Sequence, residues 1–182
     1  MFKKVDILDE KEPILRETAK EAEFPLSKKE KDLIQRSIDH LTYSQIEEYE
    51  KKYDLRPGMG LAFPQLGISK RIIIIVHEYD DGKFDNYVVI NPKIVSNSSE
   101  IIATEAGEGC LSVNREVEGI VPRHARITVE AYDENGDLYD IRVREDMAVA
   151  FQHELDHLDG ILFTDKIDPK NPYKNKDIYR AI

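Results

Sequence analysis

The segment His153-Glu154-Leu155-Asp156-His157 places two histidines four residues apart, with a glutamate directly after the first. On a helix this spacing brings both imidazoles to one face, where they can bind one divalent metal ion. Glu154 would lie about 100° around the helix, where its carboxylate can reach a water molecule without binding the metal. A lone histidine on a helix is usually structural. These two have apolar neighbours, however, and buried imidazoles need partners. The segment therefore predicts a hydrolytic metal site.

A catalytic metal needs a third protein ligand, and the residues downstream do not supply one. Phe163 stands where one class of zinc protease has a further histidine, and Asp177, the acidic residue nearest to another class's ligand position, lies in a Pro- and Asn-rich tail. Cys110 is favoured by its setting, Gly107-Glu108-Gly109-Cys110-Leu111-Ser112, because glycine allows close backbone approach and a thiolate binds borderline metals strongly. The other upstream candidates are several carboxylates and His124, His77 and His40.

A second glycine-rich segment runs Gly58-Met59-Gly60-Leu61-Ala62-Phe63-Pro64-Gln65-Leu66-Gly67. It is not a dinucleotide loop, which would follow a strand and open a helix, and it lacks the Gly-Lys-Ser/Thr of a phosphate loop. A simple turn into an edge strand explains it equally well. Gln65 is nevertheless an uncharged donor that could stabilise an oxyanion.

The composition limits the class of protein to which these motifs can belong. The 182 residues, 41% of them hydrophobic, fit one domain over residues 1–182. A formal charge of −10 argues against a general nucleic-acid binder. No apolar run is long enough to span a membrane, and the N-terminus lacks the apolar region of a signal peptide. With Cys110 as the one cysteine no internal disulfide can form, so we expect a soluble protein in a reducing compartment, the cytoplasm. Composition alone would make Cys110 an inert core residue.

Helices are predicted in the first third of the chain. Pro13 suits a first helical turn. Ser27-Lys28-Lys29-Glu30 has the spacing of a capping box and predicts a second helix that breaks near Thr42. Ser44-Gln45-Ile46-Glu47 repeats this signature and predicts a third helix to about Tyr53.

The remaining elements are mostly strands. Runs rich in β-branched and aromatic residues predict strands over 71–76, 87–90, 101–103, 126–132 and 138–143, and Asn91-Pro92 should end the second. One last helix, over 145–158, should end at Gly160 and carries the two histidines. The order predicts an α+β fold, with mostly antiparallel strands packed around a buried metal-binding helix and additional N-terminal helices.

Three segments together resemble the motifs of peptide deformylases, in the same order and with similar spacing. They are Gly58-Met59-Gly60-Leu61-Ala62-Phe63-Pro64-Gln65, Glu108-Gly109-Cys110-Leu111-Ser112, and Gln152-His153-Glu154-Leu155-Asp156-His157. The resemblance runs from about Gly58 to Phe163, and we expect it to extend over the whole chain. The helical residues before Gly58 and the stretch from Arg115 to Arg126 resemble the longer, type II branch found in Gram-positive bacteria. At Phe63 the family has alanine, so bulk is added beside the substrate groove if this ring points inward.

The resemblance implies an enzyme of protein biosynthesis that hydrolyses the formyl group from the N-terminal formylmethionine of new polypeptides and releases formate. Carried over residue by residue, Glu154 would transfer the proton of the attacking water. The backbone N–H of Leu111 and the side chain of Gln65 would hold the oxyanion. The metal ligands would be Cys110, His153 and His157, and the substrate-binding residues Gly60, Met59, Gly109 and Val149.

The resemblance also implies one divalent metal ion, Fe²⁺ in first place, with Zn²⁺, Ni²⁺ or Co²⁺ as replacements. The expected partners are N-formylmethionyl peptides and, transiently, the ribosome. We expect a monomer that binds neither a membrane nor a specific nucleic-acid sequence. Two other interpretations remain open at this point: a zinc metallopeptidase that cuts internal bonds, and a non-catalytic peptide-binding homologue.

Overall fold

The computed structural model describes residues 2–79 and 81–182. Its main sheet is antiparallel, with the strand order β1-β2-β3-β6-β7. A smaller sheet has the order β5-β4-β8, in which β4 and β8 are parallel. The strands are β1 (Gly60–Ala62), β2 (Ile72–Glu78), β3 (Phe84–Asn97), β4 (Ile101–Ala103), β5 (Arg123–His124), β6 (Arg126–Tyr132), β7 (Leu138–Arg144) and β8 (Arg180–Ala181).

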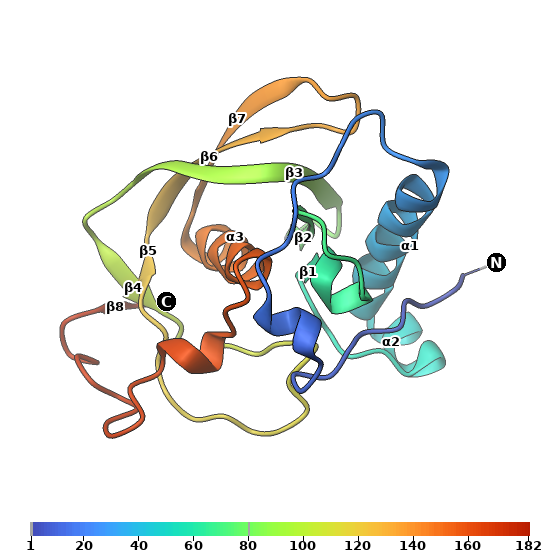
Figure 1. The fold of residues 1–182 in the computed structure, drawn as a ribbon. Helices are drawn as coiled ribbons and strands as arrows, with labels where there is room; N and C mark the ends of the chain where they lie inside the picture. Colours follow the sequence, from blue (N-terminus) through green and yellow to red (C-terminus); the bar gives the residue numbers. More distant parts are fainter. Residues whose placement is uncertain (1, 80) are drawn as a thin grey trace.

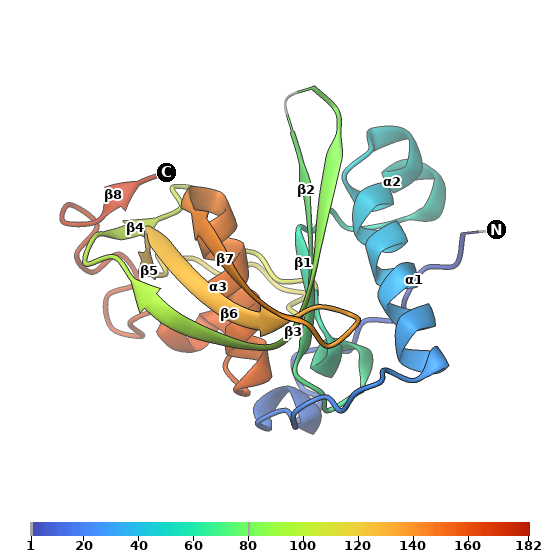
Figure 2. The same ribbon diagram turned by 90° about the horizontal axis from the view of Figure 1, so that it is seen from above.

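Two helices lie on opposite sides of the β1–β2 region (Figure 2). The first is α1 (Lys28–Ser44), followed by the short α2 (Glu47–Tyr53); the second is α3 (Glu145–Leu158). The side chains of β2 alternate between them. Ile73 and Ile75 pack with Phe151 of α3, whereas Ile72 and Ile74 pack in a second core with residues of α1. Because both faces of β2 are covered, this strand is apolar and β-branched throughout rather than alternating with polar residues. The expected α+β fold around a buried helix is confirmed.

Helix α3 has the predicted bounds and is buried on most of its surface, including at both histidines. Ser27 caps α1 as predicted: its hydroxyl accepts the Glu30 N–H, and the Glu30 carboxylate accepts the Ser27 N–H. The second capping box is wrong. Ser44 is the last residue of α1 and its hydroxyl bonds the carbonyl of Leu41, while α2 begins at Glu47 after Ile46.

Two further expectations are corrected. Pro13 opens only a four-residue 3₁₀ helix, Pro13–Arg16. Strand β3 does not stop at Asn91-Pro92 but continues to Asn97. Its pairing with β6 shifts register between Ile90 and Lys93, and Asn91 adopts a φ of 50°. This irregularity takes the proline out of the regular hydrogen-bond ladder, so the strand can pass through it.

No helix in the described part of the chain is long and apolar enough to cross a membrane.

A buried histidine makes the stability of the fold pH-dependent. His40 of α1 is 4% exposed, and its Nδ1 accepts the Val5 N–H at 3.4 Å. Burial, with the charge of Lys4, lowers the pKa of His40 from 6.5 to about 4. The unfolded chain therefore binds more protons than the folded one between these values, so stability is complete above 6.5 and is lost as the pH falls toward 4.

We expect His40→Leu to reduce this loss by roughly 1–2 kcal/mol, since the apolar side chain has no proton to gain on unfolding. Urea unfolding of both proteins at about pH 7 and about pH 5 measures the difference. An equally steep loss in His40→Leu would contradict the assignment.

Candidate metal centre

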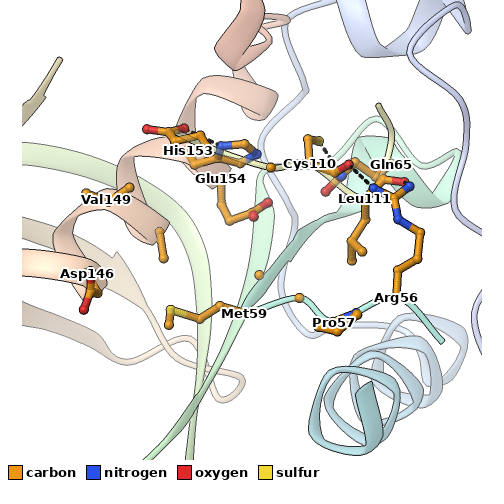
Figure 3. A pocket seen from close by; sticks show the side chains of 15 residues that line it. Arg56, Pro57, Met59, Gln65, Cys110, Leu111, Asp146, Val149, His153 and Glu154 are labelled. Carbon is orange, nitrogen blue, oxygen red and sulfur yellow. Dashed lines mark hydrogen bonds and ion pairs between the residues drawn. The ribbon is translucent and has the colours of Figure 1, made fainter. Parts of the chain in front are cut away.

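One pocket collects the predicted site residues (Figure 3). Its volume is about 340 Å³, and it lies between the open edge of β1, the segment around Cys110 (residues 107–114, called the cysteine segment below) and α3. All of the sequence-predicted site residues except His157 line this pocket: Met59, Gly60, Gln65, Gly109, Cys110, Leu111, Val149, His153 and Glu154. The imidazole of His157 reaches the Cys110 sulfur from α3.

The three predicted metal ligands converge. One donor atom each from Cys110, His153 and His157 lies within 4.8 Å of the others, and the Cys110 Sγ is 3.3 Å from the His157 Nε2. Three donors around one tetrahedral ion would stand roughly 3.3–3.8 Å apart, given bond lengths of about 2.0–2.3 Å. A thiolate with two imidazoles suits zinc or ferrous iron. The donor set therefore fits one divalent metal ion.

A buried ion pair orients His153. Glu108 takes two hydrogen bonds from Arg123, at 2.7 and 2.8 Å, and its Oε2 also accepts the His153 Nδ1–H at 2.8 Å. Burial alone would raise the pKa of Glu108, but the hydrogen bonds from Arg123 and His153 outweigh it and lower that pKa to about 2. The carboxylate thus stays charged and orients the ring so that Nε2 faces the site, where a binding metal ion would displace its proton.

The pKa values of the two histidines are shifted in opposite directions. Burial would lower the pKa of His153, but the neighbouring Cys110 and Glu108 outweigh it and raise that pKa to about 10. Burial lowers the pKa of His157 well below its ordinary value, and the charge of His153 adds to this. The His157 Nδ1 is buried and has no hydrogen-bond partner within the described residues.

Glu154 is also buried, next to the metal ligands. Its Oε2 has no hydrogen-bond partner in residues 2–79 and 81–182. Burial raises the pKa of Glu154 to about 7, although the charge of His153 opposes this. A carboxyl group with such a pKa can accept and return a proton near neutral pH, which is what a general base and acid must do.

The carboxylate of Glu154 lies directly against the backbone of Gly60. A Cβ added at Gly60 would stand 2.7 Å from the Glu154 Cγ and still closer to its Oε1. We expect Gly60→Ala to displace the carboxylate and lower kcat by about 10- to 100-fold. At Gly109 an added Cβ meets no atom within 4 Å, so Gly109→Ala should leave the melting temperature unchanged. It therefore controls for the effect of replacing a glycine on folding, not for the effect on turnover. Full turnover in Gly60→Ala would show that the carboxylate can move without loss.

Two neutral donors stand near the sulfur. The Gln65 Oε1 accepts the Ala62 N–H at 2.8 Å, which fixes the amide so that its nitrogen lies 3.1 Å from the Ser112 Oγ and 3.7 Å from the Cys110 Sγ. The Leu111 N–H donates to no acceptor in the part of the chain that the structure describes. Because backbone N–H groups are normally paired in a folded protein, an unpaired one beside the pocket can donate to a bound ligand.

Phe63 and the alternative histidine ligands lie outside the pocket. Phe63 is fully buried in the core beneath α1, so its ring does not enter the groove and adds no bulk there. Of the alternative ligands, His124 bonds the Ser98 carbonyl, His77 packs against Tyr79, and His40 lies in α1.

Three residues of the site were missed from the sequence: Glu108, Arg123 and Arg56. Glu108 stands in the cysteine segment, which marked it only as one carboxylate among many. Arg123 and Arg56 carry no local signal, because each reaches the cysteine segment across the fold.

We expect Glu108→Gln to weaken metal binding by about 10- to 100-fold, because the amide loses the charge that holds His153 and Arg123. Competition with a metal chelator measures the affinity. Glu105→Gln, an exposed carboxylate three residues upstream, should bind the metal as the unmodified chain does. Equal affinities in the two variants would remove Glu108 from the support of the site.

Comparison with known proteins gives one consistent result. The sequence model of the polypeptide deformylase family matches residues 4–173. A peptide deformylase of Halalkalibacterium halodurans is 48% identical over 94% of both chains, and peptide deformylase 2 of Bacillus subtilis is 45% identical over 97% of this chain and 96% of its own. The crystal structure of peptide deformylase from Thermotoga maritima has 34% identity and a TM-score of 0.71 and covers 92% of this chain and 99% of that one.

Proposed function

The chain belongs to the polypeptide deformylase family, and we propose that Cys110, His153 and His157 hold its metal ion while Glu154 moves the proton of the attacking water. As a peptide deformylase it removes the formyl group from the N-terminus of newly made peptides and releases formate. The observation that carries the proposed site is the convergence of one sulfur and two imidazole nitrogens beside a buried carboxylate.

A group of the site can be assigned to each step of the hydrolysis. The bound metal ion supplies Lewis acidity, which lowers the pKa of water and polarises a carbonyl. Glu154 takes a proton from water as the water oxygen attacks the formyl carbon. When the C–N bond breaks, Glu154 returns that proton to the nitrogen and the amine leaves; the formic acid loses its remaining proton to solvent and leaves as formate. The Leu111 N–H and the Gln65 amide would stabilise the oxyanion formed between these steps.

The substrate would enter as an extra strand. β1 stands at the end of the main sheet and pairs with β2 on one edge. Its other edge faces the pocket, with Met59 and Gly60 on one side and Gly109 on the other. An extended peptide can pair with such an edge. Its first side chain would then lie against Val149, one turn of α3 before His153.

We further propose ferrous iron as the metal in the cell, with zinc, nickel or cobalt as replacements. A thiolate site of this kind is open to oxidation. Protein prepared without oxygen should hold one iron per chain and turn over formyl-Met peptides. Preparation in air should lower both. Iron-free protein with full activity from an anaerobic preparation would contradict this choice.

The remaining proposals concern the setting. We propose that the enzyme works in the cytoplasm as a monomer, with transient contact to the ribosome, where formylated chains emerge. Sedimentation of the purified protein alone tests the monomeric state, and sedimentation with ribosomes tests the contact; fractionation of cells tests the location.

One assay tests the reaction itself. Incubation with formyl-Met-Ala-Ser should release formate and leave Met-Ala-Ser intact. Cleavage at an internal peptide bond without formate would identify a metallopeptidase instead. Binding of the peptide without turnover would identify a non-catalytic homologue.

A further inference from the structure

Arg56 reaches the cysteine segment from the other side of the pocket (Figure 3). It follows α2 and precedes β1, yet its guanidinium donates four hydrogen bonds to the residues around Cys110. Nη2 donates to the carbonyls of Cys110 and Val113 at 2.9 and 3.2 Å. Nη1 donates to the Leu111 carbonyl at 3.2 Å and to the Asn114 Oδ1 at 2.6 Å.

The contact with Cys110 has a consequence for Leu111. The Cys110 carbonyl and the Leu111 N–H belong to one planar peptide group, so a hydrogen bond that fixes the carbonyl also fixes the direction of the N–H. The same carbonyl accepts the Val113 N–H at 3.1 Å. A charged donor on a carbonyl also draws electron density from the amide, which makes its N–H a stronger donor.

The charge of Arg56 is not cancelled locally. All four of its acceptors are neutral, and no carboxylate lies within ion-pair distance of it in residues 2–79 and 81–182. Arg115 lies in the same part of the fold but differs in this respect. It forms an exposed ion pair with Glu10, at 2.8 Å, and its side chain donates to no carbonyl of the cysteine segment.

We propose that Arg56 is a positioning residue for catalysis: it aims and polarises the peptide group between Cys110 and Leu111, whose N–H holds the oxyanion. The inference rests on the proposed function. This role differs from that of an arginine that only stabilises the loop. Loss of a loop-stabilising residue would weaken metal binding and the fold, whereas loss of Arg56 should lower kcat.

The test compares Arg56→Gln with Arg115→Gln in the metal-loaded enzyme. Arg56→Gln should lower kcat by about 10- to 100-fold, a share of the effect of removing a whole oxyanion donor. Its KM for formyl-Met-Ala-Ser, its affinity for the product Met-Ala-Ser and its metal content should stay within about two-fold, because these do not depend on a developing oxyanion. Arg115→Gln should match the unmodified enzyme in every measurement.

Two further readouts make the result decisive. Hydrogen exchange at the Leu111 amide should quicken in Arg56→Gln and stay unchanged in Arg115→Gln. Arg56→Lys, which keeps the charge but not the planar fork, should fall between glutamine and arginine in kcat. The proposal is overturned if Arg56→Gln loses metal or product affinity in proportion to turnover, if both glutamine variants behave alike, or if lysine restores full kcat. Failure of the unmodified enzyme to release formate would instead refute the proposed function.

Discussion

Glu154→Gln should lower kcat by about 10²- to 10⁴-fold and leave the metal in place. Glutamine has nearly the same shape as glutamate, so the contact with the Gly60 backbone can persist. Its amide cannot accept a proton from water or return one to the leaving nitrogen. The buried environment that raises the pKa of Glu154 to about 7 is suited to a neutral side chain, so the variant should fold.

The measurements are formate release, metal content and melting temperature on the same preparation. Asp146→Asn is the matched control, since Asp146 is an exposed carboxylate of α3 that lines the same pocket seven residues before His153. It should retain turnover within about two-fold, because an exposed charge is screened by solvent and contributes little. Turnover near the unmodified level in a metal-loaded Glu154→Gln would remove Glu154 from the mechanism.

Local signals in the sequence were enough for the elements that carry the site. The His-Glu-x-x-His spacing, the bounds of α3 and the capping box of α1 all depend on residues within one or two turns of each other. The β-branched run of β2 could be identified because burial on both faces removes the need for polar positions. These features follow from helical and strand geometry, so tertiary contacts need not be known.

The parts that could not be predicted depend on long-range pairing. Arg56 donates to the carbonyl of Cys110, a residue 54 positions further along the chain. Arg123 lies in β5 and pairs with Glu108, and the sequence does not reveal that the fold brings these two residues together. The direction in which the Phe63 ring points depends on which side of the segment after β1 faces α1, and this is settled only when the sheet and the helix pack together. The passage of β3 through Asn91-Pro92 depends on the register shift against β6. A proline in a strand pattern signals an end only when no such irregularity accommodates it.

Composition alone favoured an inert core role for Cys110, whereas the structure places its sulfur among the proposed metal ligands. The residue is 6% exposed and does pack with Val113 and Phe163, so its burial alone cannot be told from that of a core cysteine. What separates it from a core cysteine is that the His157 Nε2 lies 3.3 Å and the Gln65 amide nitrogen 3.7 Å from its sulfur. Cysteines that react or bind metal have polar or charged neighbours, whereas structural cysteines are packed among apolar groups, so this setting supports the proposed ligand role.

Cys110→Ala is therefore expected to abolish stoichiometric metal binding and, with it, turnover. The change removes one of three donors and leaves two imidazoles, which cannot form the three-ligand layout of a catalytic site. The fold should persist, since Cys110 belongs to a small cluster apart from the two cores around β2. The melting temperature should thus match that of the metal-free unmodified chain rather than that of the loaded enzyme.

Metal analysis after dialysis measures the loss, and the result differs from that of Glu154→Gln in kind. In Cys110→Ala added metal should restore little activity, because the binding site itself is incomplete. In Glu154→Gln the metal is present from the start and the proton transfer is missing. A stoichiometric metal content in Cys110→Ala would refute the ligand assignment.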